Sequence, residues 1–169
     1  NILIVGAGKG IGLETARLLV DENLLTISRN VTPELTSLET AFLELDVAKD
    51  DLNQISLPDE LHGLVFCPGS INLRPFNRLS ENDFLADFNQ NFMGAIRIVQ
   101  KCLPALKKSK SASIVLFSTV AGKLGMPFHT SIAASKGAIE GFAKSLAAEL
   151  ATANIRVNVI APSLSDTSL

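Results

Sequence analysis

Short apolar runs alternate with longer stretches of helical periodicity along the whole chain. The apolar runs predict β-strands at Ile2–Val5, Leu24–Ile27, Phe42–Leu45, Leu64–Cys67, Ile114–Phe117 and Ile155–Ile160. Short, near-continuous apolar strands are typical of a parallel sheet that is covered on both faces. The segments between the strands are therefore expected to contain the helices that cover the sheet.

Apolar residues at helical spacing predict the helices between these strands. The helical stretches are Ile11–Val20, Glu81–Leu106 and Ser131–Ala151. Ser80 suits the N-cap of the second helix, whereas Gly94 and Pro104 weaken its middle and its end. The segment Asn30–Ala41 is too short for a full crossover helix, so we expect an irregular connection there. Strands separated by helices favour an α/β fold, a doubly wound parallel sheet of the Rossmann type with three layers in a single domain.

Composition and charge narrow the classes of partner. Hydrophobic residues make up 47% of the chain and charged residues 19%, and the net charge is −2. These values fit a packed globular domain. Because no block of Lys or Arg stands out, nucleic acid is not an expected partner. No apolar run reaches the length of a membrane span and no signal peptide is recognisable, so we expect no membrane association.

Cys67 and Cys102 lack the spacing of a disulfide framework or a metal site, so we expect free thiols, a reducing cytoplasm and no metal. Both ends of the sequence look cut. Asn1 leads directly into an apolar strand, and Leu169 follows turn-like residues. We expect residues 1–169 to form a nucleotide-binding domain that lacks its C-terminal segment.

Glycines fill the turn between the first predicted strand and the first predicted helix. The turn reads Gly6-Ala7-Gly8-Lys9-Gly10-Ile11-Gly12. Glycines at these places permit a tight turn, close approach of a pyrophosphate and close packing of the helix on the strand. The helix N-terminus offers N–H groups and positive potential to phosphates. The loop predicts a dinucleotide site, and a purely structural turn is the alternative.

The end of the second predicted strand discriminates between NAD and NADP. An acidic residue there would bind the ribose hydroxyls, but the sequence reads Ile27-Ser28-Arg29-Asn30. Arg29, together with Lys9 of the loop, suits a 2′-phosphate. This pair favours NADP(H) over NAD(H), unless both are ordinary surface cations.

Taken together and in this order, the motifs resemble the short-chain dehydrogenase/reductase family over nearly the whole chain. The spacing of Gly6, Gly10 and Gly12 matches the glycine loop of that family. Other matching segments are Asp46-Val47, Gly69, Asn91-Phe92-Met93-Gly94, Ile114–Gly122, Ala134-Ser135-Lys136, Arg156–Pro162 and Thr167. The chain departs from the family where Phe66, Cys67 and Pro68 replace Asn-Asn-Ala before Gly69, and where Ser163 replaces a glycine.

The resemblance implies hydride transfer between a nicotinamide cofactor and a small carbonyl or alcohol. With the loop, it implies cofactor contacts from Gly6, Gly8, Lys9, Gly10, Ile11, Gly12, Arg29, Asp46, Val47, Gly69, Lys136, Pro162 and Thr167. Asp46-Val47 would contact the adenine, and Thr167 would lie near the nicotinamide carboxamide. The resemblance also implies a homodimer or homotetramer that packs through the helices Glu81–Leu106 and Ser131–Ala151.

The chemistry of the family depends on a Tyr that this chain lacks. In the family, the Tyr is the general acid or base, a Lys lowers its pKa, and a Ser orients the substrate oxygen. Here Lys136 is present, Ile132 occupies the Tyr position, and Thr119 keeps a hydroxyl at the Ser position. Asn91 completes the polar set, and the chain contains no Tyr.

Other groups near the missing phenol are alternatives for its role. Ser118 could share the role of Thr119, although hydroxyls at a strand end often only satisfy loop backbone groups. His129, three residues before Ile132, is a candidate replacement acid, although a histidine in a loop is usually only a surface residue. Ser131 is also a candidate acid, but one step along a helix points it about 100° away from the Tyr position.

Nearby side chains add little to this choice. We expect Cys67 to be a buried structural thiol, and Met126 and Phe128 to be pocket wall or core. Two functions stay open. One is an NADP(H)-dependent oxidoreductase with an altered proton relay. The other is a cofactor-binding protein with weak or no turnover, acting as a sensor or structural subunit.

Overall fold

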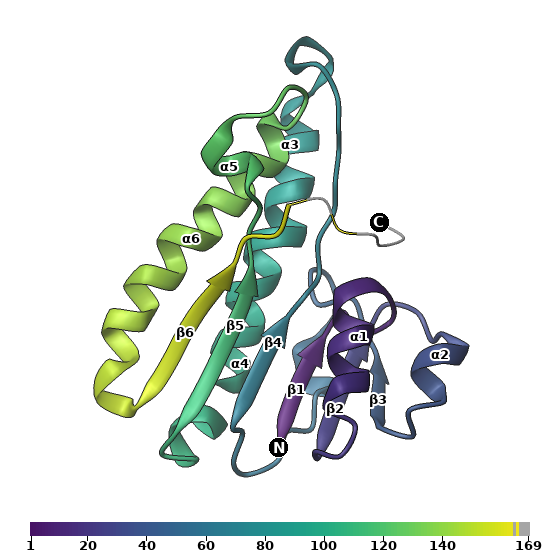
Figure 1. Cartoon of the computed structure of the whole chain (residues 1–169), viewed down its shortest axis with the longest axis vertical. Helices are drawn as coiled ribbons and strands as arrows, with labels where there is room; N and C mark the ends of the chain where they lie inside the picture. The colour runs from purple at the N-terminus through teal and green to yellow at the C-terminus, as the bar shows by residue number, and fades with distance from the viewer. Residues whose placement is uncertain (164, 166–169) are drawn as a thin grey trace.

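The computed structural model of the chain describes residues 1–163 and residue 165. Its strands form one six-stranded sheet in the order β3-β2-β1-β4-β5-β6, and every neighbouring pair is parallel (Figure 1). The strands are β1 (Ile2–Val5), β2 (Leu24–Ser28), β3 (Ala41–Glu44), β4 (Gly63–Phe66), β5 (Ala112–Phe117) and β6 (Ile155–Ile160). The predicted doubly wound Rossmann-like sheet is confirmed, and the strand order reverses between β1 and β4.

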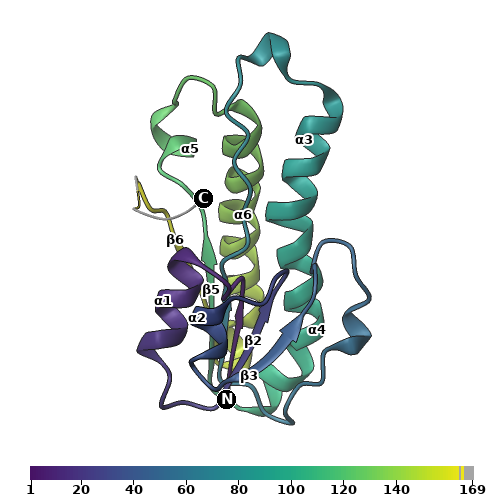
Figure 2. The ribbon, with the colours of Figure 1, turned by 90° about the vertical axis from the view of Figure 1, so that its right-hand side faces the viewer.

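Helices cover both faces of the sheet. They are α1 (Gly10–Leu18), α2 (Pro33–Thr36), α3 (Glu81–Phe88), α4 (Gly94–Lys108), α5 (Ala121–Leu124) and α6 (Thr130–Leu150). Single 3₁₀ turns lie at Leu52–Gln54, Phe76–Arg78 and Ala151–Ala153. Figure 2 shows α1 on one side of the sheet and α4 on the other. None of the helices in residues 1–163 is long and apolar enough to cross a membrane.

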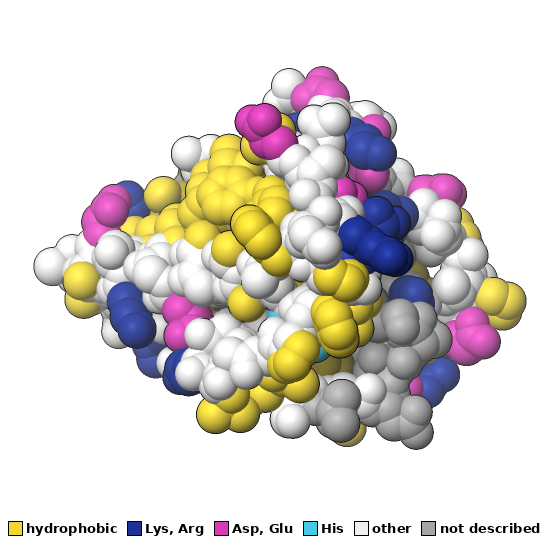
Figure 3. All heavy atoms as spheres, turned by 90° about the horizontal axis from the view of Figure 1, so that it is seen from above, with side chains coloured by type: hydrophobic (Ala, Val, Ile, Leu, Met, Phe, Trp, Pro, Cys, Tyr) yellow, Lys and Arg dark blue, Asp and Glu magenta, His cyan; other side chains and the backbone are white. Residues whose placement is uncertain are grey.

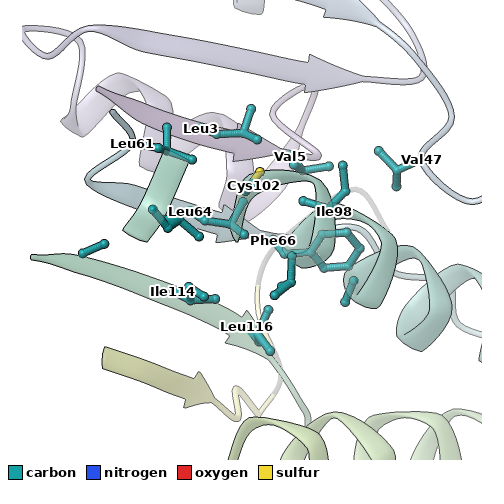
Figure 4. Packing of buried hydrophobic residues seen from close by; sticks show 14 of the residues in the cluster. Leu3, Val5, Val47, Leu61, Leu64, Phe66, Ile98, Cys102, Ile114 and Leu116 are labelled. Atoms are coloured by element: carbon teal, nitrogen blue, oxygen red, sulfur yellow. The ribbon is translucent and has the colours of Figure 1, made fainter. Parts of the chain in front are cut away.

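Side chains of each strand alternate between the two faces, as the pleat of a strand requires. Leu3 and Val5 of β1 join the larger core cluster with residues of α4 and α6, such as Ile98 and Ile139. Ile4, between them, joins the smaller cluster against α1 and α2. Figure 4 shows the larger cluster, in which the ring of Phe66 lies among aliphatic side chains of β1, β5 and α4. This core fixes the carboxyl ends of β1 and β4 side by side.

The predicted helix Glu81–Leu106 is interrupted, and this is a correction. Between α3 and α4, residues Asn89–Met93 form a π-helical turn that contains the buried Asn91. A π turn adds a residue to the helix and rotates the residues that follow it. As a result Asn91 and Gly94 are both buried. Pro104 does not end α4, which continues to Lys108.

Two smaller expectations are confirmed. The side chain of Ser80 caps α3 in a reciprocal capping box with Asp83, which satisfies backbone N–H groups at the helix start. The connection Asn30–Ala41 contains only the four-residue helix α2, so this crossover is irregular.

Candidate cofactor site and proton relay

A pocket opens at the carboxyl ends of β1, β2 and β4. Its lining includes the predicted cofactor residues Gly6, Gly8, Lys9, Gly10, Ile11, Gly12, Arg29, Asp46, Val47 and Gly69. The structure thus brings together residues that are spread over the first 69 positions of the sequence. Of the other predicted contacts, Lys136 and Pro162 lie outside this lining, and Thr167 lies outside the described residues.

The glycine loop is shaped by close backbone contacts. Gly6 has a φ of +83°, and a Cβ on this residue would lie 2.9 Å from the nitrogen of Pro68. A Cβ on Gly12 would overlap the carbonyl oxygen of Gly6. The first turn of α1 can therefore press against the end of β1 only without a side chain at Gly12. This is the cradle that a pyrophosphate at a helix N-terminus requires.

The glycine loop is held in place by Thr32, a residue that the sequence patterns did not single out. Thr32 lines the same pocket, and its hydroxyl donates a 3.0 Å hydrogen bond to the carbonyl oxygen of Gly8. Thr32 is also the N-cap of α2, since its Oγ1 accepts the N–H of Leu35. The signal was the Thr-Pro pair at the start of α2, a familiar helix-start pattern.

One end of the pocket is formed by the residues that follow β2 and β3. Arg29 lies exposed at the end of β2 and lines the pocket. On the opposite wall, Asp46 Oδ1 accepts the N–H of Ala48 at 3.0 Å. Arg97 of α4 donates to the carbonyl oxygen of Val47 at 2.6 Å. These contacts fix the Asp46-Val47 turn against the pocket, so the residues present fit a dinucleotide.

Lys136 lies at the other end of the site, on α6. Its side chain is buried, and Nζ donates a 3.0 Å hydrogen bond to the carbonyl oxygen of Phe117. Burial disfavours the ammonium form and lowers the pKa of Lys136 to about 8. Cys67 opposes this shift weakly, because burial raises the pKa of its thiol to about 12 and keeps it neutral.

Gly69 brings the lysine and the asparagine of the predicted relay to one place. A Cβ on Gly69 would lie 3.2 Å from Asn91 Oδ1 and 3.6 Å from Lys136 Nζ. Because Gly69 has no side chain, Asn91 and Lys136 can lie close behind the backbone of Gly69, which lines the pocket. The structure thus places these two predicted residues together.

The remaining members of the predicted relay are less favourably placed. Ile132 is 5% exposed and carries no proton-transfer group. Thr119 Oγ1 accepts the N–H of Ala121 at 3.3 Å, the backbone role named above as the alternative, and its own O–H is still able to donate. Ser118 cannot share the role of Thr119, because it is buried and its hydroxyl donates to Glu140 Oε1 at 2.8 Å.

The candidate replacement acids both have hydrogen-bond partners of their own. The hydroxyl of Ser131 is buried and donates to Asp87 on α3 at 2.6 Å, so it points away from the cleft. His129 is half-buried, and its Nδ1 lies 2.6 Å from the carbonyl oxygen of Pro127. Met126 and Phe128 are exposed and not core residues, which corrects that part of their interpretation.

Comparisons with known proteins show the family of the chain. The family profile described as short chain dehydrogenase matches residues 1–169. Retinol dehydrogenase 8 of Bos taurus is 34% identical over 182 aligned residues, which cover 96% of this chain and 58% of that protein. The 3-oxoacyl-[acyl-carrier-protein] reductase FabG of Thermotoga maritima is 31% identical, over 99% of this chain and 74% of that protein.

Solved structures agree as well. A structure of ElxO with NADP bound superposes with a TM-score of 0.88 at 26% identity, over 99% of this chain and 75% of that one. A 4-hydroxyisoleucine dehydrogenase complexed with NADH superposes with a TM-score of 0.84 at 25% identity, over 99% and 76%. The chain spans little more than half the length of the retinol dehydrogenase. It belongs to the short-chain dehydrogenase/reductase family, and the relatives above are oxidoreductases.

Proposed function

We propose that this chain is the NADP(H)-binding part of an oxidoreductase that acts on a small carbonyl or alcohol through an altered proton relay. The observation that carries the proposal is the pocket that joins the glycine loop to Arg29, with Asn91 and Lys136 beside Gly69 at its other end. Relatives bind NADP or NADH. The preference for NADP(H) therefore rests on the cations and on the lack of a carboxylate at the end of β2.

Each part of the pocket has a role toward the cofactor. The loop Gly6–Gly12 would hold the pyrophosphate at the start of α1. Arg29 and Lys9 would bind the 2′-phosphate, and the Asp46-Val47 turn would bind the adenine. Lys136 would hold the nicotinamide ribose, with Pro162 and Thr167 toward the carboxamide. When bound, NADP(H) supplies or accepts the hydride.

The proton that accompanies the hydride needs another route in this chain. The hydroxyl of Thr119 can orient a substrate oxygen, but Ile132 cannot protonate it. Lys136 is the titratable group of the predicted relay, and its ammonium is held by Phe117. Because general acid catalysis contributes roughly 10²–10⁴-fold, we expect slow turnover of ordinary ketones by this relay.

The surroundings of the site favour a substrate with an apolar body. Exposed apolar side chains gather at the carboxyl end of the sheet, seen from above in Figure 3. They include Ile71, Leu73, Met126 and Phe128, on two loops that are joined by a 3.3 Å hydrogen bond from Arg74 N to the carbonyl oxygen of Phe128. Exposed apolar groups of this kind often mark binding surfaces.

The test pairs a binding titration with a turnover assay. NADPH binding is measured by calorimetry, and NADPH oxidation is followed with a panel of apolar and charged aldehydes and ketones. Binding together with slow turnover, faster on the apolar members, supports the proposal. Binding without any turnover favours the cofactor-binding sensor or structural subunit, and absence of binding contradicts both functions.

Three further properties belong to the same proposal. We propose that residues 1–169 form one cofactor-binding domain. The exposed small residues of α6 support self-association as a dimer or tetramer. Cys67 and Cys102 are unpaired thiols, which suits the reducing cytoplasm.

A further inference from the structure

A buried carboxylate lies behind the site, on α3, where no sequence motif marks a functional residue. Asp87 is 3% exposed. Its Oδ1 accepts the hydroxyl of Ser70 at 2.7 Å, and its Oδ2 accepts the hydroxyl of Ser131 at 2.6 Å. A buried carboxylate is costly unless hydrogen bonds compensate it. The two short O–H···O bonds match an ionised acceptor.

The same network reaches Asn91 in the π-helical turn. Asn91 Nδ2 donates to the carbonyl oxygen of Asp87 at 2.8 Å and to Ser70 Oγ at 3.0 Å. Asn91 Oδ1 accepts the N–H of Ser70 at 3.3 Å. Since an ionised carboxylate only accepts, the Ser70 hydroxyl must donate to Asp87, and its oxygen is left to accept from Asn91. The donor and the acceptor of every hydrogen bond in this cluster are thus determined.

Both arms of the network end at the proposed nicotinamide end of the site. Ser70 directly follows Gly69, whose Cβ position faces Asn91 Oδ1 and Lys136 Nζ. Ser131 directly precedes Ile132 in the first turns of the helix that also carries Lys136. Asp87 therefore ties the segment after β4 and the start of α6 to a single point on α3.

We propose that Asp87 is a positioning residue: its carboxylate holds Gly69 and Asn91 on one side, and α6 with Lys136 on the other, at the spacing that the nicotinamide half of the cofactor needs. This inference rests on the proposed function, because it assumes that the cleft at Gly69 receives that half. The hydrogen bonds of Asp87 go to Ser70, Asn91 and Ser131, which do not line the pocket, so Asp87 acts on the site through these residues.

The test compares Asp87→Asn with a matched control on the same helix. Asp87→Asn keeps the size of the side chain but puts an amide N–H₂ against one of the two serine hydroxyls. Glu81→Gln removes an exposed carboxylate from the first turn of the same helix. The control weakens α3 without touching the network, so it reports what mere destabilisation does. Ser70→Ala, a smaller change, gives the same readouts if Asp87→Asn does not fold.

The first readout is the affinity for NADPH relative to that for adenosine 2′,5′-bisphosphate, its adenosine half. Asp87→Asn and Ser70→Ala should weaken NADPH by about tenfold and leave the bisphosphate within about twofold, a difference that corresponds to one lost interaction. Glu81→Gln should leave the ratio unchanged. Equal effects on both ligands, or no effect in a folded Asp87→Asn protein, overturn the inference.

The second readout needs no ligand and separates this inference from the proposed function. Hydrogen exchange of the Ser70 amide, measured by NMR, should become about tenfold faster in Asp87→Asn and stay unchanged in Glu81→Gln. If wild-type protein binds no NADPH, the proposed function fails, while the exchange rates still decide whether Asp87 holds this segment. Unchanged exchange at Ser70 overturns the inference even if NADPH binds.

Discussion

Lys136 Nζ donates a 3.0 Å hydrogen bond to the carbonyl oxygen of Phe117, which ties α6 to the last residue of β5. The side chain is only 8% exposed, and its burial lowers the pKa of the amine to about 8. The unfolded chain, whose lysines are hydrated, has an ordinary lysine pKa. The cost of holding a buried ammonium at neutral pH is thus built into the fold.

This cost gives the stability a specific pH dependence. Between pH 8 and the ordinary lysine pKa of 10.5, the unfolded state binds more protons than the folded state. Stability contributed at Lys136 therefore rises with pH across this window, by up to roughly 3 kcal/mol. Lys136→Met removes the titration, so wild-type protein should gain stability relative to Lys136→Met as pH rises from 8 to 10.5.

Urea unfolding followed by circular dichroism measures this difference, since the chain has no Trp or Tyr for fluorescence. The raised pKa values of the Cys67 and Cys102 thiols make stability fall as the pH rises. Because both proteins contain these thiols, comparing them at each pH cancels that effect. Lys144→Met, at an exposed lysine on the same helix, is the control and should show no such trend. A wild-type minus Lys136→Met difference that stays flat from pH 7 to 10.5 would mean that Lys136 is hydrated.

Most of the fold could be predicted from local patterns in the sequence. The apolar strands and the glycine loop depend on neighbours within a few residues, so spacing alone located them. The sequence did not reveal Asp87 as a site residue, because its hydrogen-bond partners Ser70 and Ser131 lie 17 and 44 residues away along the chain. The helical pattern of residues 81–106 is broken by the π turn at Asn89–Met93. A continuous helix drawn through this segment therefore does not show that Asp87 faces inward. No spacing rule predicts that turn.

The residues that follow β5 show again that a side chain's partner cannot be read from the sequence. Ser118 and Thr119 are adjacent, so in an extended backbone they point to opposite sides. Which of them faces the cleft depends on Glu140 of α6, which accepts the hydroxyl of Ser118. The spacing to the Tyr position favours Thr119, but the sequence could not show that the hydroxyl of Ser118 is taken up by Glu140.

The close packing of the glycine loop predicts that a single added methyl group at Gly12 weakens cofactor binding. Gly12→Ala would drive a Cβ into the carbonyl oxygen of Gly6, so the loop must move. We expect NADPH binding to weaken by at least about tenfold. Gly137→Ala is the control: a Cβ there meets open space on α6, and alanine should stabilise the helix by about 0.5–1 kcal/mol. Calorimetric titration that finds equal NADPH affinity in both variants would refute the cradle.

Arg29 predicts the choice between the two nicotinamide cofactors. Arg29→Ala should weaken NADPH by about tenfold to a hundredfold, because a charge-assisted contact to the 2′-phosphate is lost. NADH, which has no such phosphate, should bind as before. Arg17→Ala, at an exposed arginine of α1 that pairs with Glu14, controls for the loss of one positive charge. Equal losses for both cofactors would show that Arg29 does not contact the phosphate.

The outer face of α6 predicts self-association. Ala134, Gly137, Gly141 and Ala148 are exposed at helical spacing, and Cβ atoms on the two glycines would meet open space. Small residues allow a second helix to approach closely, in the way the family resemblance implies. Sedimentation at micromolar concentration should show a dimer or tetramer, and Gly141→Arg should give a folded monomer. A monomeric wild-type chain would contradict this interface.

The missing phenol predicts the largest change in activity. Ile132→Tyr places a proton donor four residues before Lys136, whose ammonium would lower the pKa of the new hydroxyl. Ile132→Phe adds the same ring without the hydroxyl, so it separates acid catalysis from a change in packing at this buried position. We expect Ile132→Tyr to accelerate NADPH-dependent reduction of a ketone by at least about tenfold, with no gain in Ile132→Phe. Adding Lys136→Ala should abolish the gain. High wild-type activity that Ile132→Tyr leaves unchanged would show that another group delivers the proton, and His129 would be the first residue to replace.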